Sequence, residues 1–117
     1  LSYSKAPWPI IWCVSSAGQL IAFAYVPEQS VGSFSSLTTD GVFESCTGVP
    51  EGEEDVLYVV VRRTINGNTR RFIERMLERK YTTLEESVHL DCCGTYRGDA
   101  KDEISGLTWL EGATVSI

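Results

Sequence analysis

The sequence lacks the elements from which most catalytic sites are built. It has a single histidine, His89, and no G-x-S-x-G nucleophile elbow, P-loop or G-x-G-x-x-G motif. His89 and Asp91 would share one face of a strand, and such a pair is more often structural than catalytic. Since a hydrolase or transferase needs a nucleophile, a base and an orienting group, we expect that the protein is not an enzyme and uses no cofactor.

Long hydrophobic runs and excess positive charge are also missing. No apolar run reaches the roughly 20 residues of a membrane span, and residues 1–12 lack the layout of a signal peptide. The net charge of −6 argues against non-specific binding of the whole chain to DNA or anionic membranes, although a local basic patch could still act. The sequence therefore predicts a soluble protein without a membrane partner.

The cysteines are too few and too unevenly spaced for a disulfide framework. Cys13 and Cys46 lie inside strand-like runs, Cys92 and Cys93 are adjacent, and no C-x-x-C is present. A metal site with His89 would need Cys13 or Cys46 to fold beside the adjacent pair. We expect buried, reduced thiols and no metal.

Turn signals recur along the first half of the chain at intervals of about ten residues, which is typical of an antiparallel meander. The length of 117 residues and the apolar share of 43% fit one globular domain, or one and a fraction. The fold class is predicted to be mainly β, resembling one blade of a propeller or one sheet of a sandwich. The predicted strands are 10–15, 19–25, 32–38, 42–48, 56–65 and 68–75.

The strongest local signal is Asn66-Gly67 between two β-rich runs. A two-residue type I′ turn needs positive φ at both central positions, which Asn-Gly adopts at little steric cost. With this turn the numbers of facing residues add to 133, so Val60 faces Ile73. Both faces of the hairpin are then apolar, and we expect both to be covered. The alternative is a helix over residues 69–80, which their helix-forming composition favours.

The pattern of turns and strands changes beyond residue 81. We expect residues 1–81 to form the propeller-like meander and residues 82–117 to begin a second, truncated β unit. Thr83 and Glu86 have the spacing of a capping box, so at most one short helix is predicted there. The missing initiator methionine and an end in apparent mid-strand suggest a piece of a larger polypeptide.

The hairpin register also gathers four arginines at its tip. Like charges facing each other in a sheet are destabilising, so an anionic partner is expected. An acidic turn precedes the hairpin and could supply that partner from a neighbouring subunit; alone, it lacks the ligand spacing of a calcium loop. The candidate interface residues are Arg62, Arg63, Arg70 and Arg71 with Glu51, Glu53, Glu54 and Asp55.

Aromatic residues support a competing hypothesis, a glycan-binding β module used for host attachment. Aromatic rings stack on the apolar faces of sugars, although most rings in a β domain are core. The rings that could line such a face are Trp8, Trp12, Tyr25, Phe43, Tyr58 and Trp109. A small accessory domain of a soluble enzyme is a further alternative.

Taken in order, several segments resemble the nozzle proteins of short-tailed bacteriophages, the tail tubular protein B-like family. The segments are AGQLIAFAY (17–25), EQSVG (28–32), DGVFES (40–45), VP (49–50), VVVRRTING (59–67), RFIER (71–75), LD (90–91), ISGL (104–107), LEG (110–112) and Val115. Residues 33–37 depart from the Trp-x-Arg-His-like element that the family usually has at this point.

The resemblance implies a structural role in a virion tail. Family members are several times longer than this chain, contain a propeller-like domain and form a homo-oligomeric ring at the end of the tail. The ring extends the channel below the portal, helps to retain packaged DNA and conducts it at ejection. The implied partners are other tail, portal and adaptor proteins, with passing DNA contact, and the implied location is the tail, assembled in the host cytoplasm.

Overall fold

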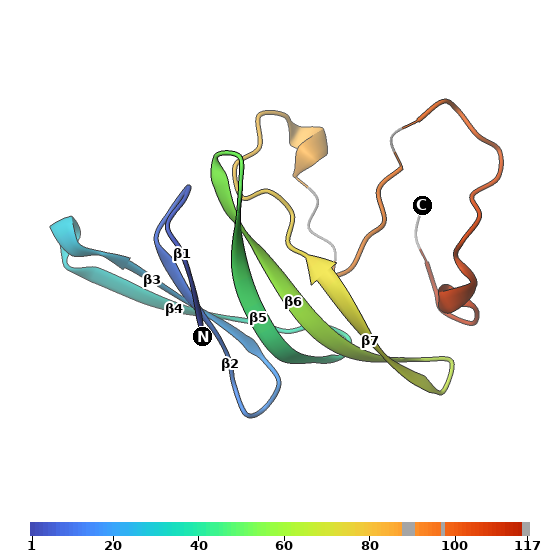
Figure 1. The fold of residues 1–117 in the computed structure, drawn as a ribbon, viewed down its shortest axis with the longest axis horizontal. Helices are drawn as coiled ribbons and strands as arrows, with labels where there is room; N and C mark the ends of the chain where they lie inside the picture. The colour runs from blue at the N-terminus through green and yellow to red at the C-terminus, as the bar shows by residue number, and fades with distance from the viewer. Residues whose placement is uncertain (88–90, 97, 116–117) are drawn as a thin grey trace.

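The residues that the structure describes form seven β-strands in two antiparallel sheets (Figure 1). The structure is a computed structural model that describes residues 1–87, 91–96 and 98–115. One sheet, sheet A, has four strands in the order β1-β2-β3-β4, and the other, sheet B, has three in the order β5-β6-β7. Their bounds are β1 Ser2–Ser4, β2 Ile10–Val14, β3 Leu20–Val26, β4 Val31–Leu37, β5 Val42–Glu51, β6 Glu54–Ile65 and β7 Asn68–Arg75.

The mainly β fold class is confirmed, and every predicted strand is present to within three residues at each end. β7 runs from Asn68 to Arg75, so the alternative of a helix over residues 69–80 is wrong. Two features were not expected. The strand β1 precedes the predicted set, and the strands divide between two sheets after β4.

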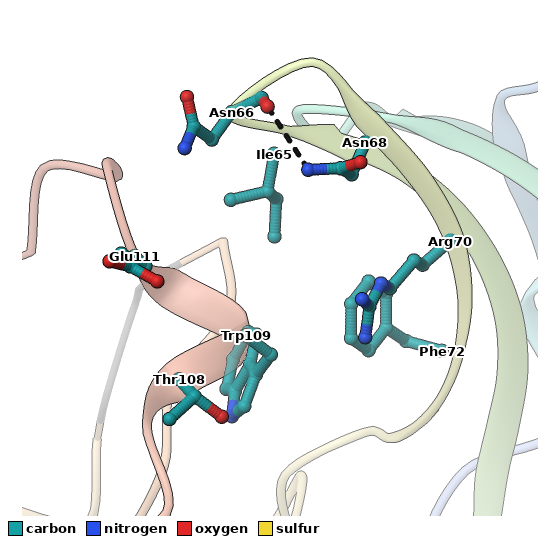
Figure 2. Close-up of a pocket in the computed structure, with 8 residues that line it drawn as sticks. All are labelled: Ile65, Asn66, Asn68, Arg70, Phe72, Thr108, Trp109 and Glu111. Carbon is teal, nitrogen blue, oxygen red and sulfur yellow. Dashed lines mark hydrogen bonds between the residues drawn. The ribbon is translucent and has the colours of Figure 1, made fainter.

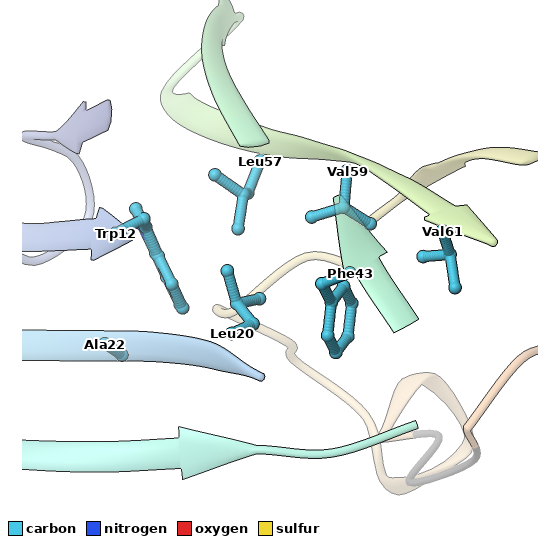
Figure 3. Close-up of a cluster of buried hydrophobic side chains, with 7 residues drawn as sticks. All are labelled: Trp12, Leu20, Ala22, Phe43, Leu57, Val59 and Val61. Atoms are coloured by element: carbon cyan, nitrogen blue, oxygen red, sulfur yellow. The ribbon is translucent and has the colours of Figure 1, made fainter. Parts of the chain in front are cut away.

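The two sheets pack against each other through a shared hydrophobic core (Figure 3). The alternation of each strand directs every second side chain to this core. Sheet A contributes Trp12, Leu20 and Ala22, and sheet B contributes Phe43, Leu57, Val59 and Val61. Each of these side chains is at most 9% exposed. The core therefore joins the sheets into one packed unit.

A polar network closes one end of the core. The indole Nε1 of Trp12 donates to the buried Ser4 hydroxyl at 3.1 Å, and that hydroxyl donates to the carbonyl of Asp55 at 3.3 Å. The Arg79 guanidinium lies 6.0 Å from the Trp12 ring and donates to the carbonyls of Ala6 and Asp55 at 2.6 and 3.0 Å. The Ser4 hydroxyl thus satisfies the buried indole N–H of Trp12, and this bond holds the short strand β1 against the core.

The β6–β7 hairpin has the predicted register. Ile65 faces Asn68 and Val60 faces Ile73, as the Asn-Gly turn requires. Asn66 and Gly67 have φ values of 49° and 73°, both positive, which agrees with a type I′ turn. Two turn residues therefore fix the alignment of the whole ladder.

Replacing Gly67 with alanine should lower the free energy of unfolding by about 1 kcal/mol, because a Cβ is strained at positive φ. Nothing lies within 4 Å of a Cβ built at this position, so the cost comes from the backbone alone. Urea denaturation measures it, and Asn66→Gly, which keeps both φ values accessible, is the matched control. A Gly67→Ala protein as stable as the parent would contradict the I′ assignment.

One expectation about the hairpin is wrong. The face opposite the core was predicted to be covered, yet Ile73 is 78% exposed on it while Val60 is half-buried. The segments after β7 that the structure describes fold elsewhere. Asp91 and Trp109 contact the core side of the hairpin instead: Asp91 accepts from Arg63, and the ring centroid of Trp109 lies 5.4 Å from that of Phe72.

Residues after β7 have little regular structure in the ranges described. Residues 76–87, 91–96 and 98–115 contain no strand and only two 3-10 turns, Leu84–Glu86 and Thr108–Leu110. The first begins after Thr83 as predicted, but Thr83 makes no capping bond through its side chain; Thr82 donates to the Glu86 carboxylate instead. A separate unit over residues 82–117 stays a prediction.

Candidate functional site: the arginine hairpin

The four predicted arginines lie at the hairpin tip but on two faces of the sheet. Arg62 faces Arg71 and Arg63 faces Arg70, as the register required. Because neighbouring positions of a strand point in opposite directions, the first pair lies on the outer face and the second on the core side. The tip therefore presents two separate pairs of like charges.

Glu44 neutralises the outer pair. Its carboxylate accepts from Arg62 Nε at 3.1 Å and from Arg71 Nε and Nη2 at 2.6 and 3.3 Å. The ladder shifts between Phe43 and Ser45, and this bulge places Glu44 beside both arginines. The hydrogen bond from Arg71 is the main reason that the pKa of Glu44 lies below its usual value. Exposed bridges of this kind add little stability, so they mainly orient the arginines.

Arg63 is held by more bonds than any of the other three. Its side chain is only 7% exposed and forms a bidentate pair with Glu74, at 2.7 Å from Nε and 3.0 Å from Nη2. Nη1 donates to the carbonyl of Asp40 at 2.7 Å and to Asp91 at 3.2 Å. The bonds to Glu74 are the largest cause of the raised pKa of Arg63, with Asp91 adding to them against the effect of burial.

Asp91 connects this arginine to the loop between the two sheets. It accepts from the hydroxyl of Thr39 and, at 2.9 Å, from the amide of Asp40. Burial alone would raise the pKa of Asp91, but these bonds and Arg63 outweigh it and hold the pKa below its usual value. Residue 91 thus ties a segment beyond the hairpin to sheet B and to the loop that joins the two sheets.

Acid should destabilise the protein through these carboxylates. The pKa values of Glu44, Glu51, Asp55 and Asp91 are all lowered in the folded state, so the folded protein binds fewer protons than the unfolded one. Their contribution is complete above the unfolded value of about 4 and is lost as the pH falls through the folded values. Denaturant unfolding between about pH 6 and pH 2 measures this loss.

The variant Asp91→Asn removes one of these titrating groups, so its stability should fall less steeply with acid than that of the parent. Glu53→Gln, which changes an exposed turn residue, is the control. A parent protein whose stability is constant or rises on acidification would contradict the assignment.

Arg70 has a different environment from the other three. It makes no ion pair among the residues that the structure describes, and it lines a cavity of about 150 Å³ at the hairpin tip (Figure 2). The rings of Phe72 and Trp109 form an aromatic wall of this cavity. Its other lining residues are Ile65, Asn66, Asn68, Thr108 and Glu111. The cavity thus combines aromatic surface with amide, hydroxyl and charged groups.

The acidic residues proposed as partners make other contacts within the chain. Glu51 accepts from the Tyr58 hydroxyl at 2.6 Å and from Arg75 at 3.0 Å. Glu54 accepts from the backbone amides of residues 79 and 80, and Asp55 accepts from those of residues 5 and 6. Glu53 lies exposed in the turn. Pairing of this cluster with the arginines of a neighbouring subunit stays a prediction.

Sequence reasoning missed the carboxylates that contact the arginines. The predicted register could have identified Glu74, because position 74 lies on the same face of the hairpin as Arg63. The position of Glu44 could not be predicted, because the bulge shifts the alternation of β5 by one residue. Asp91 comes from a segment 28 positions away in sequence, and no local pattern indicates its approach.

The remaining site predictions have mixed outcomes. All four cysteines are free, but only Cys13 and Cys46 are half-buried, so the expected burial of Cys92 and Cys93 is wrong. His89 lies outside the described residues, and so do the pairing and metal site considered for it. Within the described ranges, no three His, Cys, Asp or Glu side chains are placed to hold a metal, and no helix is long and apolar enough to cross a membrane.

The predicted aromatic face does not form. Trp12 and Phe43 are in the core, Tyr58 is bonded to Glu51, and Trp109 packs beside the hairpin. Among the six rings named from the sequence, Trp8 and Tyr25 are exposed, by 54% and 47%.

No protein-family model matches the chain, and no curated protein matches its sequence.

Proposed function

We propose that the chain is part of a structural protein of a bacteriophage tail, which forms a homo-oligomeric ring and takes part in retaining and releasing DNA. The observation that carries the proposal is the packing of two successive antiparallel sheets through one core. Propellers are built from successive meanders of about four strands that pack in this way. Nozzle proteins, which the sequence resembles, contain a propeller-like domain, and we propose that the two sheets form part of one.

The positions of the resembling segments in the fold add support. AGQLIAFAY covers the β2–β3 turn and most of β3, DGVFES contains the bulge that places Glu44, and VVVRRTING with RFIER forms the β6–β7 hairpin. Most residues of these four segments lie in strands of the two-sheet unit. A structural role depends on such a packed unit and does not require a reactive side chain.

The outer face of the hairpin is the surface through which we propose that neighbouring subunits meet. Ile73 is 78% exposed there, and the side chains of Arg62 and Arg71 retain 44% and 69% exposure despite their bonds to Glu44. Charged groups around an exposed apolar residue resemble the rim and centre of a protein interface. Carboxylates of the next subunit, such as those of residues 51–55, could join the arginines.

Reversing both charges, Arg62→Glu with Arg71→Glu, should weaken ring assembly of the full-length protein by roughly tenfold or more, because like charges would then face the acidic cluster. Lys80→Glu with Lys101→Glu changes the net charge equally and is the control. Sedimentation velocity measures the ring, and circular dichroism reports folding. Unchanged assembly would remove the charge-pairing hypothesis without affecting the proposed function.

The function itself is tested by negative-stain imaging of the full-length polypeptide, alone and mixed with portal and adaptor complexes. We expect rings that dock below the adaptor. A protein that remains monomeric and ignores both complexes would overturn the proposal.

A glycan-binding module is the second candidate, and the cavity at the hairpin tip favours it. Sugar sites combine an aromatic wall with polar side chains, and here Phe72 and Trp109 lie beside Arg70, Thr108 and Glu111. Titration with a panel of cell-surface sugars should then quench tryptophan fluorescence in the parent but not in Trp109→Leu. An absence of quenching across the panel would remove this candidate.

A further inference from the structure

The strand β4 is an edge strand without the usual protection. It pairs with β3 along one side, and sheet A ends there. Six of its seven residues are exposed, and residues 30–39 include no charged residue and no proline. Natural edge strands are normally blunted by lysine, proline, a bulge or a covering segment, because their free amides and carbonyls accept another strand. The described residues supply none of these devices along β4.

The outer face of sheet A is apolar as far as this edge. Tyr3, Ile11, Phe23 and Phe34 are aligned across its four strands, on the side opposite the core. Phe34 is 74% exposed and its ring lies 4.4 Å from that of Phe23. The other residues of this face are Cys13, Ile21, Tyr25, Gly32 and Ser36, so it has no acidic or basic side chain.

We propose that β4 pairs antiparallel with β4 of a second copy of the chain, about a twofold axis at Phe34. Phe34 is the central residue of β4, so this pairing places Phe34 opposite its own copy. Val31 then faces Leu37, and Ser33 faces Ser35. The strand is thus complementary to itself, as a twofold interface requires, and its lack of charge avoids like-charge repulsion.

The pairing would join two four-stranded sheets into one continuous sheet and extend the aromatic row across the axis. Aromatic pairs facing each other across strands stabilise such a junction. A second copy is favoured over a charged peptide as the partner, because neither the strand nor its outer face has a charged side chain that could pair with such a peptide. The inference concerns the edge of sheet A and is independent of the proposed tail function.

Sedimentation equilibrium of the 117-residue chain tests the pairing, in a Cys92→Ser, Cys93→Ser background that removes the exposed thiols. We expect a dimer whose dissociation constant rises by roughly tenfold or more in Phe34→Lys, which sets two cations face to face. Leu84→Lys changes a residue that is 83% exposed in a 3-10 turn outside both sheets, and it should leave the dimer unchanged. A chain that is monomeric at every concentration overturns the proposal, as does a Phe34→Lys dimer of unchanged affinity.

Disulfide trapping tests the register in case Phe34→Lys does not fold. Facing residues of paired strands have Cα separations that a disulfide can bridge, so Phe34→Cys should cross-link to its own copy under mild oxidation. Ser36→Cys lies opposite Gly32 of the other copy and should not cross-link. Equal cross-linking of the two variants would overturn the proposed axis.

Discussion

Replacing Arg63 with methionine should lower the free energy of unfolding by about 2 to 4 kcal/mol. The guanidinium is nearly buried and bonds to Glu74, Asp91 and the carbonyl of Asp40, so its removal leaves these acceptors without their donor. The partial exposure of Asp91, 42%, keeps the expected value below that of a fully buried pair. Chemical denaturation measures the change.

Two further variants distinguish the effect of losing the ion pair from the effect of losing the packing of the side chain. Arg70→Met changes the arginine directly opposite, which is exposed and has no ion pair among the described residues, and should cost no more than about 0.5 kcal/mol. Arg63→Met combined with Glu74→Leu removes both charges and should be less harmful than Arg63→Met alone. Equal effects of Arg63→Met and Arg70→Met would show that the network does not hold the hairpin.

Replacing Leu57 with alanine should destabilise the protein by about 2 to 5 kcal/mol, because the change leaves a cavity in the core between the sheets. Leu57 is 1% exposed and belongs to the same cluster as Trp12 and Leu20 of the other sheet. Leu84→Ala is the matched control, since Leu84 is 83% exposed and should change stability little.

The same pair of variants distinguishes one packed unit from two independent sheets. If the sheets share their core, Leu57→Ala shifts a single cooperative transition that is the same by fluorescence and by circular dichroism. A loss of sheet B signal alone, with sheet A unfolding as in the parent, would contradict the shared core.

The hairpin shows how much a sequence determines when a turn and a pattern agree. Asn66 and Gly67 demand one turn type, that turn fixes the register, and the register gives the facing pairs of β6 and β7. Here local propensity favoured a helix over residues 69–80. Tertiary context decided for the strand, because Phe72 and Val61 face each other beside the shared core.

The contacts of the arginines could not be predicted in the same way. The sequence indicated that the like charges at the tip need anionic partners. The acidic cluster at residues 51–55 was the candidate that its composition suggested. The structure supplies Glu44 through a bulge, Glu74 from the same face of the hairpin as Arg63, and Asp91 from a distant segment. A bulge and a long-range approach both depend on packing, which no local pattern encodes.

The separation of the strands into two sheets has a similar cause. The turn signal at Asp40-Gly41 looks like the other turns, but here the chain leaves sheet A and starts sheet B. Gly41 has a φ of 154°, and a Cβ there would lie 2.7 Å from the carbonyl of Arg62. The glycine thus permits a close approach between the connection and β6 that a hairpin turn would not require.

The tail proposal predicts that a phage genome encodes this chain, and immunogold labelling of the particles of that phage tests the proposal most directly. Antibodies raised against residues 1–81 should label the tail below the portal, at a single site per particle. Labelling of the capsid or of fibres would contradict the proposed place in the virion. So would an absence of labelling, after the tails are opened, on particles in which mass spectrometry detects the full-length polypeptide.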